Sequence, residues 1–250
     1  MTREVWKTRI TKNTPEETLI RGYPLEEVIE KLSFAEATYL LLKGELPSKE
    51  HAAVMNAILV SCVDHGLNPP SIQAGRRVIS GGSPLQAGVA AGVLALGDSH
   101  GGAIEQCAKF IKEAVDNGKS VEEVVEEAVA NKKRLPGFGH KIYKVDPRAQ
   151  ELLKVAKKNN LCGKYVEFAV ALEVALEKAK GRKLCMNIDG ITAALLLEMD
   201  FPWQVGKGFF IIGRTVGLVA HCTEESMEAK PFRRLSNEDV EYTGQDKRTI

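Results

Sequence analysis

From residue 24 onward, one pattern repeats along the sequence: an apolar stretch with helical spacing lies between a helix-starting and a helix-ending signal. Prolines or capping serines open these stretches, and glycines or polar turns close them. The stretches are 25–32, 34–43, 48–59, 71–79, 84–95, 104–117, 121–132, 147–158, 165–180, 191–198 and 206–225. No run of alternating β-branched residues is longer than the one in the N-terminal arm, residues 1–23. The pattern therefore predicts an all-α fold.

Side chains that can cap helices set several of the expected boundaries. Ser33 and Glu36 have the spacing of a capping box, and Gly44 follows as a helix end. Ser48 is the expected cap of the next helix, and Ser71 is the expected cap of the helix that runs to about residue 79. Each such cap satisfies backbone amides that the first turn of a helix leaves without a partner.

Composition excludes several classes of partner. The chain has 250 residues and a net charge of +1, so nothing in its overall charge favours nucleic acid or an acidic membrane surface. Lys207 and Arg214 interrupt the longest apolar stretch, residues 205–220, which is too short to span a bilayer. The N-terminus lacks an apolar signal core, and five scattered cysteines form no Cys-x-x-Cys pair. We therefore expect a cytoplasmic protein with reduced thiols and no structural zinc.

The segment around His140 is the most suggestive candidate site. Pro136, Gly137 and Gly139 break any helix and allow the backbone to approach a ligand closely. A histidine able to act near neutral pH follows them, and then come the cations Lys141, Lys144 and Arg148. Such a stretch is either a site for an anionic substrate or a solvated basic loop.

Three further residues stand beside turns. His100 precedes Gly101 and Gly102, so a ligand carbonyl could approach its imidazole; a plain turn is the alternative. His65 either ends a helix or faces a site. Asp189 either caps the helix that follows it or serves as a base.

Arg214 lies in the middle of a helix that is apolar nearly all round and rich in glycine. A buried guanidinium without a partner is very unfavourable, and no acidic residue lies within one helical turn. Its partner is therefore another segment or a substrate carboxylate, which arginine can bind in a bidentate manner. Lys230 and Arg233 add cationic groups near the C-terminus.

Phosphate-loop, dinucleotide, zinc-protease and serine-hydrolase motifs are all missing from the sequence. What remains is three histidines beside turns, one aspartate and a few arginines. This set suits acid–base chemistry on a carbonyl substrate with several negative charges, without a metal.

An ordered series of motifs resembles the citrate synthases. In chain order these are Arg21-Gly22-Tyr23-Pro24, Gly44-Glu45-Leu46-Pro47, Asp64-His65, His100-Gly101-Gly102-Ala103, Pro136-Gly137-Phe138-Gly139-His140, Asp146-Pro147-Arg148, Asn187-Ile188-Asp189, Gly213-Arg214 and Tyr242-Thr243-Gly244. The series runs nearly from end to end of the chain. The link from Pro47 to Asp64 is far shorter than in ordinary citrate synthases, and this compact form resembles the citryl-CoA lyases and the C-terminal module of ATP-citrate lyase.

Two smaller departures concern individual residues. Lys230-Pro231 stands where many citrate synthases have Arg-Pro, so either Lys230 or Arg233 would be the cation of that position. The spacing from His140 to Asp146 is one residue tighter than is common, which puts the role of Lys144 in question.

The resemblance implies a role for each matching residue. His100 would stabilise the enol or enolate of acetyl-CoA, Asp189 would exchange the methyl proton, and His140 would act on the oxaloacetate carbonyl or the citryl hydroxyl. The implied oxaloacetate-binding residues are His65, Arg148, Arg214 and, from across a dimer interface, Arg233 or Lys230. The implied coenzyme A-binding residues are Pro136, Gly137, Phe138, Gly139, Lys141 and Lys144.

The resemblance also implies an architecture and a reaction. It implies a homodimer or larger homo-oligomer whose large helical domain, residues 1–103 plus 206–250, carries a small mobile domain, residues 104–205. The expected reaction is cleavage of citryl-CoA to acetyl-CoA and oxaloacetate, with coenzyme A thioesters as substrates, no tightly bound cofactor and, as one option, a separate citryl-CoA synthetase as partner. The alternative is a compact citrate synthase that also hydrolyses the thioester to citrate. A non-catalytic paralogue is disfavoured because His100, His140 and Asp189 are all present.

Overall fold

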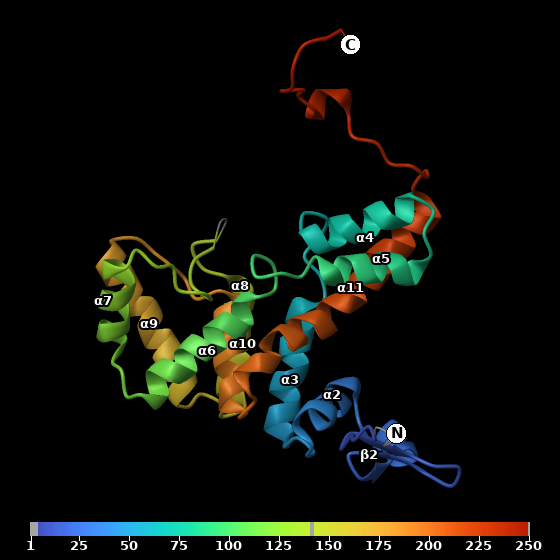
Figure 1. Cartoon of the computed structure of the whole chain (residues 1–250). Helices are drawn as coiled ribbons and strands as arrows, with labels where there is room; N and C mark the ends of the chain where they lie inside the picture. Colours follow the sequence, from blue (N-terminus) through green and yellow to red (C-terminus); the bar gives the residue numbers. More distant parts are fainter. Residues whose placement is uncertain (1–4, 141–142, 250) are drawn as a thin grey trace. The chain divides into compact units, whose positions relative to one another are not determined.

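The computed structural model describes residues 5–140 and 143–249 (Figure 1). Its strands and α-helices are β1 (Thr11–Asn13), β2 (Thr18–Ile20), β3 (Tyr23–Pro24), α1 (Leu25–Lys31), α2 (Phe34–Lys43), α3 (Lys49–Cys62), α4 (Pro70–Ser80), α5 (Leu85–Leu94), α6 (Ala103–Asp116), α7 (Val121–Ala130), α8 (Pro147–Lys158), α9 (Lys164–Lys180), α10 (Ile188–Glu198) and α11 (Gly206–Glu228). Short 3₁₀ turns are η1 (Trp203–Val205) and η2 (Asn237–Asp239). The all-α prediction is confirmed, because the described strands form only one small sheet. No helix in the described part of the chain is long and apolar enough to cross a membrane.

The chain forms two compact units, which are described separately. The first comprises Met1–Asp64 and Leu96–Arg214, and the second comprises His65–Ala95 and Thr215–Ile250. These boundaries differ from those of the predicted mobile domain, residues 104–205, whose motion stays a prediction.

The N-terminal arm is the strand-forming part of the first unit. β1, β2 and β3 form an antiparallel sheet in which Thr11 pairs with Ile20 and Leu19 pairs with Pro24. The Arg21 guanidinium donates two hydrogen bonds to the Leu41 carbonyl, at 3.1 and 2.7 Å. This contact ties the sheet to the C-terminal end of α2.

Most of the expected caps are confirmed. Ser33 and Glu36 form a capping box, Gly44 ends α2 with a φ of 93°, and Ser48 caps α3. The expectation for Ser71 is wrong: α4 begins at Pro70, and Ser71 is buried in its first turn. Proline at the first helical position has a fixed φ suited to a helix, so the helix starts two residues earlier than a Ser71 cap predicts.

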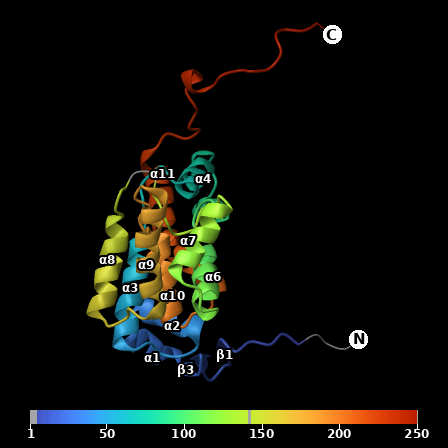
Figure 2. The same cartoon turned by 90° about the vertical axis from the view of Figure 1, so that its left-hand side faces the viewer.

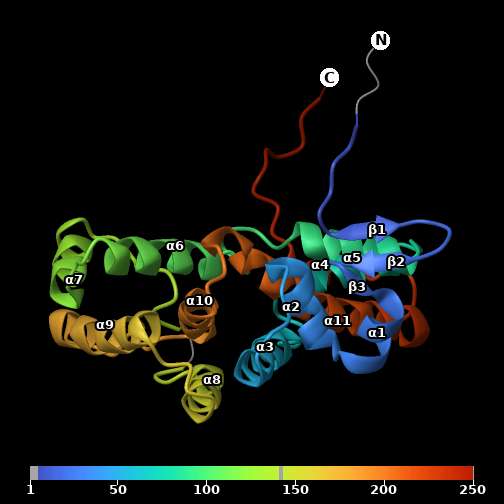
Figure 3. The same ribbon diagram turned by 90° about the horizontal axis from the view of Figure 1, so that it is seen from below.

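The centre of the first unit is α10. Nine of its eleven residues are buried, and α6, α8 and α9 pack around it (Figures 2 and 3). A helix that is apolar on every side is stable in water only when other elements cover it all round. The first turn of α10, which carries Asp189, is therefore held by the core of the unit.

The second unit is built from α4, α5 and the part of α11 that follows Arg214. A Cβ atom on Gly88 would lie 2.7 Å from Ile79 and 3.1 Å from the Cys222 thiol. A Cβ atom on Gly92 would lie 2.3 Å from Leu218. The small residues that the sequence places in this helix therefore allow α5 to pack closely against α4 and α11.

The segment from Gly137 to His140 packs directly on the start of α10. The Gly137 carbonyl accepts a hydrogen bond from the Asn187 amide at 3.0 Å, and the Gly139 amide donates to the Cys185 carbonyl at 2.7 Å. A Cβ atom on Gly137 would lie 2.7 Å from the Gly190 Cα atom. Two glycines facing each other thus bring the histidine segment into backbone contact with the helix.

We predict that Gly137→Ala destabilises the protein by about 1–3 kcal/mol, since the added methyl group overlaps α10 and Gly137 has a φ of +84°. Gly139→Ala is the matched control, because its φ is +94° but the nearest atom, on Leu184, is 3.5 Å from the added Cβ. Thermal unfolding of both variants measures the difference, and equal losses would show that steric overlap with α10 is unimportant.

Candidate active site

Asp189 lies in the first turn of α10 but does not cap it. The cap is Asn187, whose side-chain oxygen accepts hydrogen bonds from the Asp189 and Gly190 amides at 3.0 and 3.2 Å. Burial raises the pKa of the Asp189 carboxyl to about 6, with a smaller contribution from Asp146, while Arg148 and Arg214 oppose the rise. A carboxyl group with this pKa can gain or lose a proton near neutral pH, as a general acid or base requires.

Asp146 holds Arg148 beside α10. The Asp146 side chain is fully buried and accepts hydrogen bonds from Arg148 Nε at 3.1 Å, from Arg148 Nη2 at 2.9 Å and from the Ile188 amide at 3.1 Å. Burial alone would raise the pKa of Asp146, but these bonds and the charge of Arg148 outweigh burial, so its pKa is lowered. One ionised carboxylate thus joins a predicted substrate-binding arginine to the helix that carries Asp189.

Arg214 is a buried cation with spare hydrogen-bonding capacity. The residue is 2% exposed, its Nε donates to the Cys62 carbonyl at 2.9 Å, and its guanidinium lies 5.0 Å from the centre of the Phe210 ring. Its Nη1 atom has no hydrogen-bond partner among residues 5–140 and 143–249. A buried donor of this kind favours an anionic ligand with oxygen atoms.

The neighbouring glycine explains how Arg214 reaches this position. A Cβ atom on Gly213 would lie 2.8 Å from the Leu59 carbonyl oxygen and 2.9 Å from the Cys62 Cβ atom. α11 therefore passes α3 in close contact, and the guanidinium reaches the carbonyl at the end of α3. The prediction of a buried Arg214 is confirmed.

His100 is held against an aromatic ring. Its imidazole packs edge-on to Phe210, with ring centres 5.8 Å apart, and a Cβ atom on Gly101 would lie 2.7 Å from the same ring. Burial lowers the pKa of His100, and the charge of Arg214 lowers it further. The ring is therefore mainly neutral at pH 7 and can donate a single hydrogen bond to a carbonyl oxygen.

His140 has a defined tautomer. Its Nδ1 atom accepts a hydrogen bond from the Tyr143 amide at 3.1 Å, and the ring lies 4.6 Å from the Tyr143 ring. A neutral ring that accepts at Nδ1 carries its proton on Nε2. Nε2 is therefore the nitrogen through which His140 can act on a substrate oxygen.

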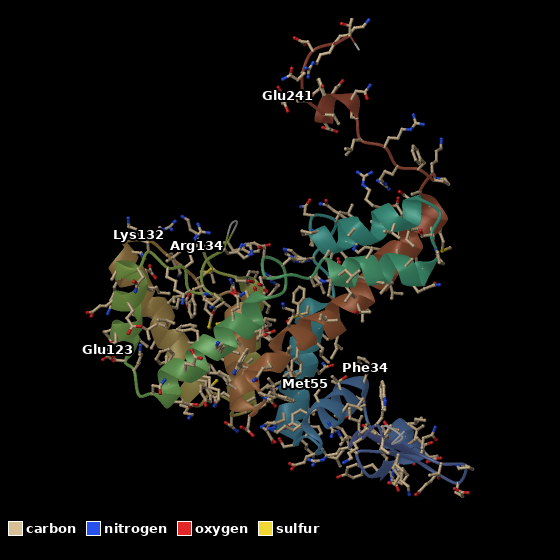
Figure 4. All side chains as sticks on the ribbon, in the orientation of Figure 1. Phe34, Met55, Glu123, Lys132, Arg134 and Glu241 are labelled. Carbon is tan, nitrogen blue, oxygen red and sulfur yellow. The ribbon has the colours of Figure 1, made fainter. Side chains whose placement is uncertain are left out.

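His140 also lines a basic cavity of about 630 Å³. The cations of the cavity come from the segment after α7 (Figure 4 labels Lys132 and Arg134) and from the end of α9 and the segment that follows it. They are Lys132, Lys133, Arg134, Lys180 and Arg182. No acidic residue is among the described lining residues, so the cavity favours a ligand with several negative charges.

Apart from His140 and the segment Pro136 to Gly139, the predicted site residues fall into three groups. Electrostatic interactions link Asp189, Arg148 and Arg214 with one another, and His100 with Arg214. His65, Lys230 and Arg233 belong to the second unit. Lys144 is exposed, and the prediction for Lys141 lies outside the described residues.

Arg233 is engaged within its own unit. Its Nε and Nη2 atoms bind the two oxygens of Glu225 at 2.9 and 2.8 Å, and Arg76 binds the same carboxylate at 2.6 Å. The Glu225 side chain is fully buried, and the two arginines lower its pKa despite that burial. These contacts give Arg233 a structural role in the second unit, whereas the Lys230 side chain is exposed.

Sequence reasoning missed Asp146, Asn187 and the Cys62 carbonyl as parts of the site. Asp146 directly precedes Pro147, a typical arrangement at a helix start, and this signal could have identified it as a cap. A backbone carbonyl carries no sequence signal. Within the described residues, no group of three or more His, Cys, Asp or Glu side chains could hold a metal ion.

A family model of the C-terminal domain of citrate synthase matches residues 47–235. The chain belongs to the citrate synthase family. Within this family, the chain is 50% identical to the solved citryl-CoA lyase of Hydrogenobacter thermophilus, covering 99% of this chain and 98% of that one with a TM-score of 0.96.

Two longer relatives match the chain over part of their length. ATP-citrate synthase beta chain protein 1 of Arabidopsis thaliana is 30% identical over 256 residues, which cover 94% of this chain and 41% of the relative. The structure of ATP citrate lyase from Methanothrix soehngenii, solved with citrate and coenzyme A, is 25% identical with a TM-score of 0.90, covering 99% of this chain and 43% of that one. The chain thus spans less than half of these longer members of the citrate synthase family.

We predict that Asp189→Asn stabilises the protein at about pH 8 and gives no gain at about pH 4. An acid whose pKa is raised in the folded state contributes stability below its unfolded value, and this contribution is lost as the pH rises through about 6. The rise corresponds to at most about 3 kcal/mol, or several degrees in melting temperature. Thermal unfolding at both pH values measures the effect, and an unchanged melting temperature at the higher pH would contradict the raised pKa.

Proposed function

We propose that the protein is a citryl-CoA lyase, which cleaves citryl-CoA to acetyl-CoA and oxaloacetate. The observation that carries this proposal is the likeness to a citryl-CoA lyase over nearly the whole of both chains. The short link between Gly44-Glu45-Leu46-Pro47 and Asp64-His65 is consistent with it, because α3 alone fills most of that link.

The proposed cleavage uses His140, His100 and Asp189. The hydroxyl oxygen of citryl-CoA becomes the carbonyl oxygen of oxaloacetate. His140 donates a hydrogen bond to this oxygen from Nε2, and we assign the hydroxyl proton to a water molecule. The carbon–carbon bond breaks, and the electron pair passes to the thioester as an enolate, whose oxygen accepts a hydrogen bond from His100. Asp189 in its acid form then donates a proton to the carbon that becomes the methyl group of acetyl-CoA.

The geometry supports these assignments in physical terms. A carbon acid beside a thioester is very weak, so a carboxylate needs help from a donor at the oxygen, and one such donor is worth about 3–4 kcal/mol. The neutral His100 suits that task. Arg148 and the buried Arg214 suit the carboxylates of the four-carbon part of the substrate.

We propose that the basic cavity beside His140 binds the phosphate groups of coenzyme A. The cavity is lined by its five cations, by His140 and by the apolar side chains of Leu135, Phe138, Leu176 and Leu184. The proposal extends the predicted coenzyme A segment, Pro136 to Lys144, to the end of α9 and beyond. We propose no tightly bound cofactor, and residues 104–205 are proposed to move toward the bound substrate.

We also propose that the chain forms a homodimer through α5. Gly88 and Gly92 face the second unit's own helices, whereas Ala90 and Leu94, on the opposite side of the same helix, are exposed, Leu94 to 85%. An apolar helix with an uncovered face favours burial against another subunit. We further propose that the protein is cytoplasmic and that it works with a separate citryl-CoA synthetase.

A compact citrate synthase is the second candidate, because the carbon–carbon step is the same in both enzymes. The two differ only in hydrolysis of the thioester. A purely binding or regulatory protein would not need Asp189, His100 and two arginines in mutual electrostatic contact.

We predict that the protein releases oxaloacetate from citryl-CoA and releases no free thiol from acetyl-CoA plus oxaloacetate. Oxaloacetate release from citryl-CoA is measured by its reduction with a coupled dehydrogenase. Thiol release from acetyl-CoA plus oxaloacetate is measured with a thiol reagent. Asp189→Asn is the matched control and is expected to lose at least about 100-fold in kcat. Rapid thiol release from acetyl-CoA plus oxaloacetate would overturn the lyase in favour of the synthase.

We predict that Lys180→Ala and Arg182→Ala each raise the KM for citryl-CoA by roughly 3- to 30-fold at low salt, since each removes a cation from the phosphate-binding cavity. The effect shrinks at about 0.5 M salt, because exposed charges are screened. Lys178→Ala is the control, since Lys178 also lies at the end of α9 but lines a different groove, beside α7. Unchanged KM values in both cavity variants would remove the phosphate assignment.

A further inference from the structure

Both ends of the Asn187 side-chain amide are used where the His140 segment meets α10. The oxygen accepts from the Asp189 and Gly190 amides at 3.0 and 3.2 Å. The nitrogen donates to the Gly139 carbonyl at 2.9 Å. The backbone amide of the same residue donates to the Gly137 carbonyl at 3.0 Å.

These bonds connect the segment that carries His140 with the segment that carries Asp189. Gly139 is covalently joined to His140, and Asp189 follows Asn187 by two residues. The amide group is planar, so its oxygen and nitrogen cannot move independently. If the His140 segment moved away from α10, either the hydrogen bond from Asn187 to Gly139 would break or the Asn187 side chain would rotate away from the α10 amides that it caps.

Capping alone does not explain an asparagine at this position. Serine, threonine and aspartate cap helices about as well as asparagine. None of them can accept from the helix and also donate to a carbonyl on the other side through a second, separate atom at this distance. The second bond is therefore the property that distinguishes asparagine here.

We propose that Asn187 is a positioning residue that keeps His140 in register with Asp189. This inference rests on the proposed function, because His140 is assigned to the hydroxyl oxygen and Asp189 to the methyl carbon in one turnover. A displacement of about 1 Å between a reacting group and its substrate can lower the rate about 100-fold. Asn187 touches neither transferred proton and acts through the two backbone segments that it joins.

The discriminating variant is Asn187→Ser, which keeps a cap and loses the donor to Gly139. We expect kcat for citryl-CoA cleavage to fall at least about tenfold while the KM changes less than about threefold. Asn187→Asp is a second variant, which keeps the shape and the cap, removes the donor and adds a negative charge. Asn187→Asp tests the inference if Asn187→Ser does not fold, and the same loss of kcat is expected for it.

Asn159→Ser is the matched control. Its side-chain nitrogen also donates to a backbone carbonyl, that of Val155 at 2.8 Å, but at the end of α8. The control is expected to keep the wild-type kcat. A wild-type kcat in Asn187→Ser and Asn187→Asp, with an active wild-type enzyme, would overturn the positioning role and leave the proposed function intact.

Amide hydrogen exchange tests the inference independently of activity. The amides of Gly139 and Asn187 are expected to exchange at least about tenfold faster in Asn187→Ser than in the wild-type protein, because the two segments separate more often. Those of the α8 helix are expected to be unchanged. If the wild-type protein cleaved no citryl-CoA, the proposed function would fail, and unchanged exchange at Gly139 would then overturn this inference separately.

Discussion

The close contact between Gly137 and Gly190 is the constraint on which the candidate site depends. A Cβ atom on Gly190 would lie 2.5 Å from the Gly137 carbonyl oxygen, so neither position tolerates a side chain. Because the backbones touch, Asn187 can bond to both segments, and the Cys107 thiol fills the space beneath them. The relative position of His140 and Asp189 is therefore a property of the backbone, which is harder to displace than a long side chain.

The charges around Asp189 differ in the partners that they bind. Asp146 neutralises Arg148 through two hydrogen bonds, and Arg214 Nε donates to the neutral Cys62 carbonyl. The two buried thiols near Asp189, Cys62 and Cys107, have raised pKa values because of burial and stay protonated at neutral pH. Burial of the Asp189 carboxyl is the main reason for its raised pKa. The region thus combines the buried Arg214 cation with a carboxyl group that ionises reluctantly.

Local signals predicted the helices and the separate residues of the site, but not the bonds between them. Ser33, Gly44 and Ser48 act within a few residues of themselves, so their caps could be read from the sequence. Ser71 failed because Pro70 offered a competing start, and Asp189 was a false cap candidate because Asn187 lies closer to the helix start. The bond from Asp146 to Ile188 spans 42 residues, and that from Arg214 to Cys62 spans 152. Such pairings arise only when the core brings distant segments together.

Four consecutive residues at the start of α10 have separate tasks. Asn187 joins two segments, Ile188 donates to Asp146, Asp189 holds the titrating carboxyl, and Gly190 makes room for Gly137. Few substitutions in this stretch are expected to be without effect, because a change at any of the four residues disturbs a different part of the fold. Substitutions that leave the site intact are therefore expected on exposed surfaces away from this stretch and from the basic cavity beside His140.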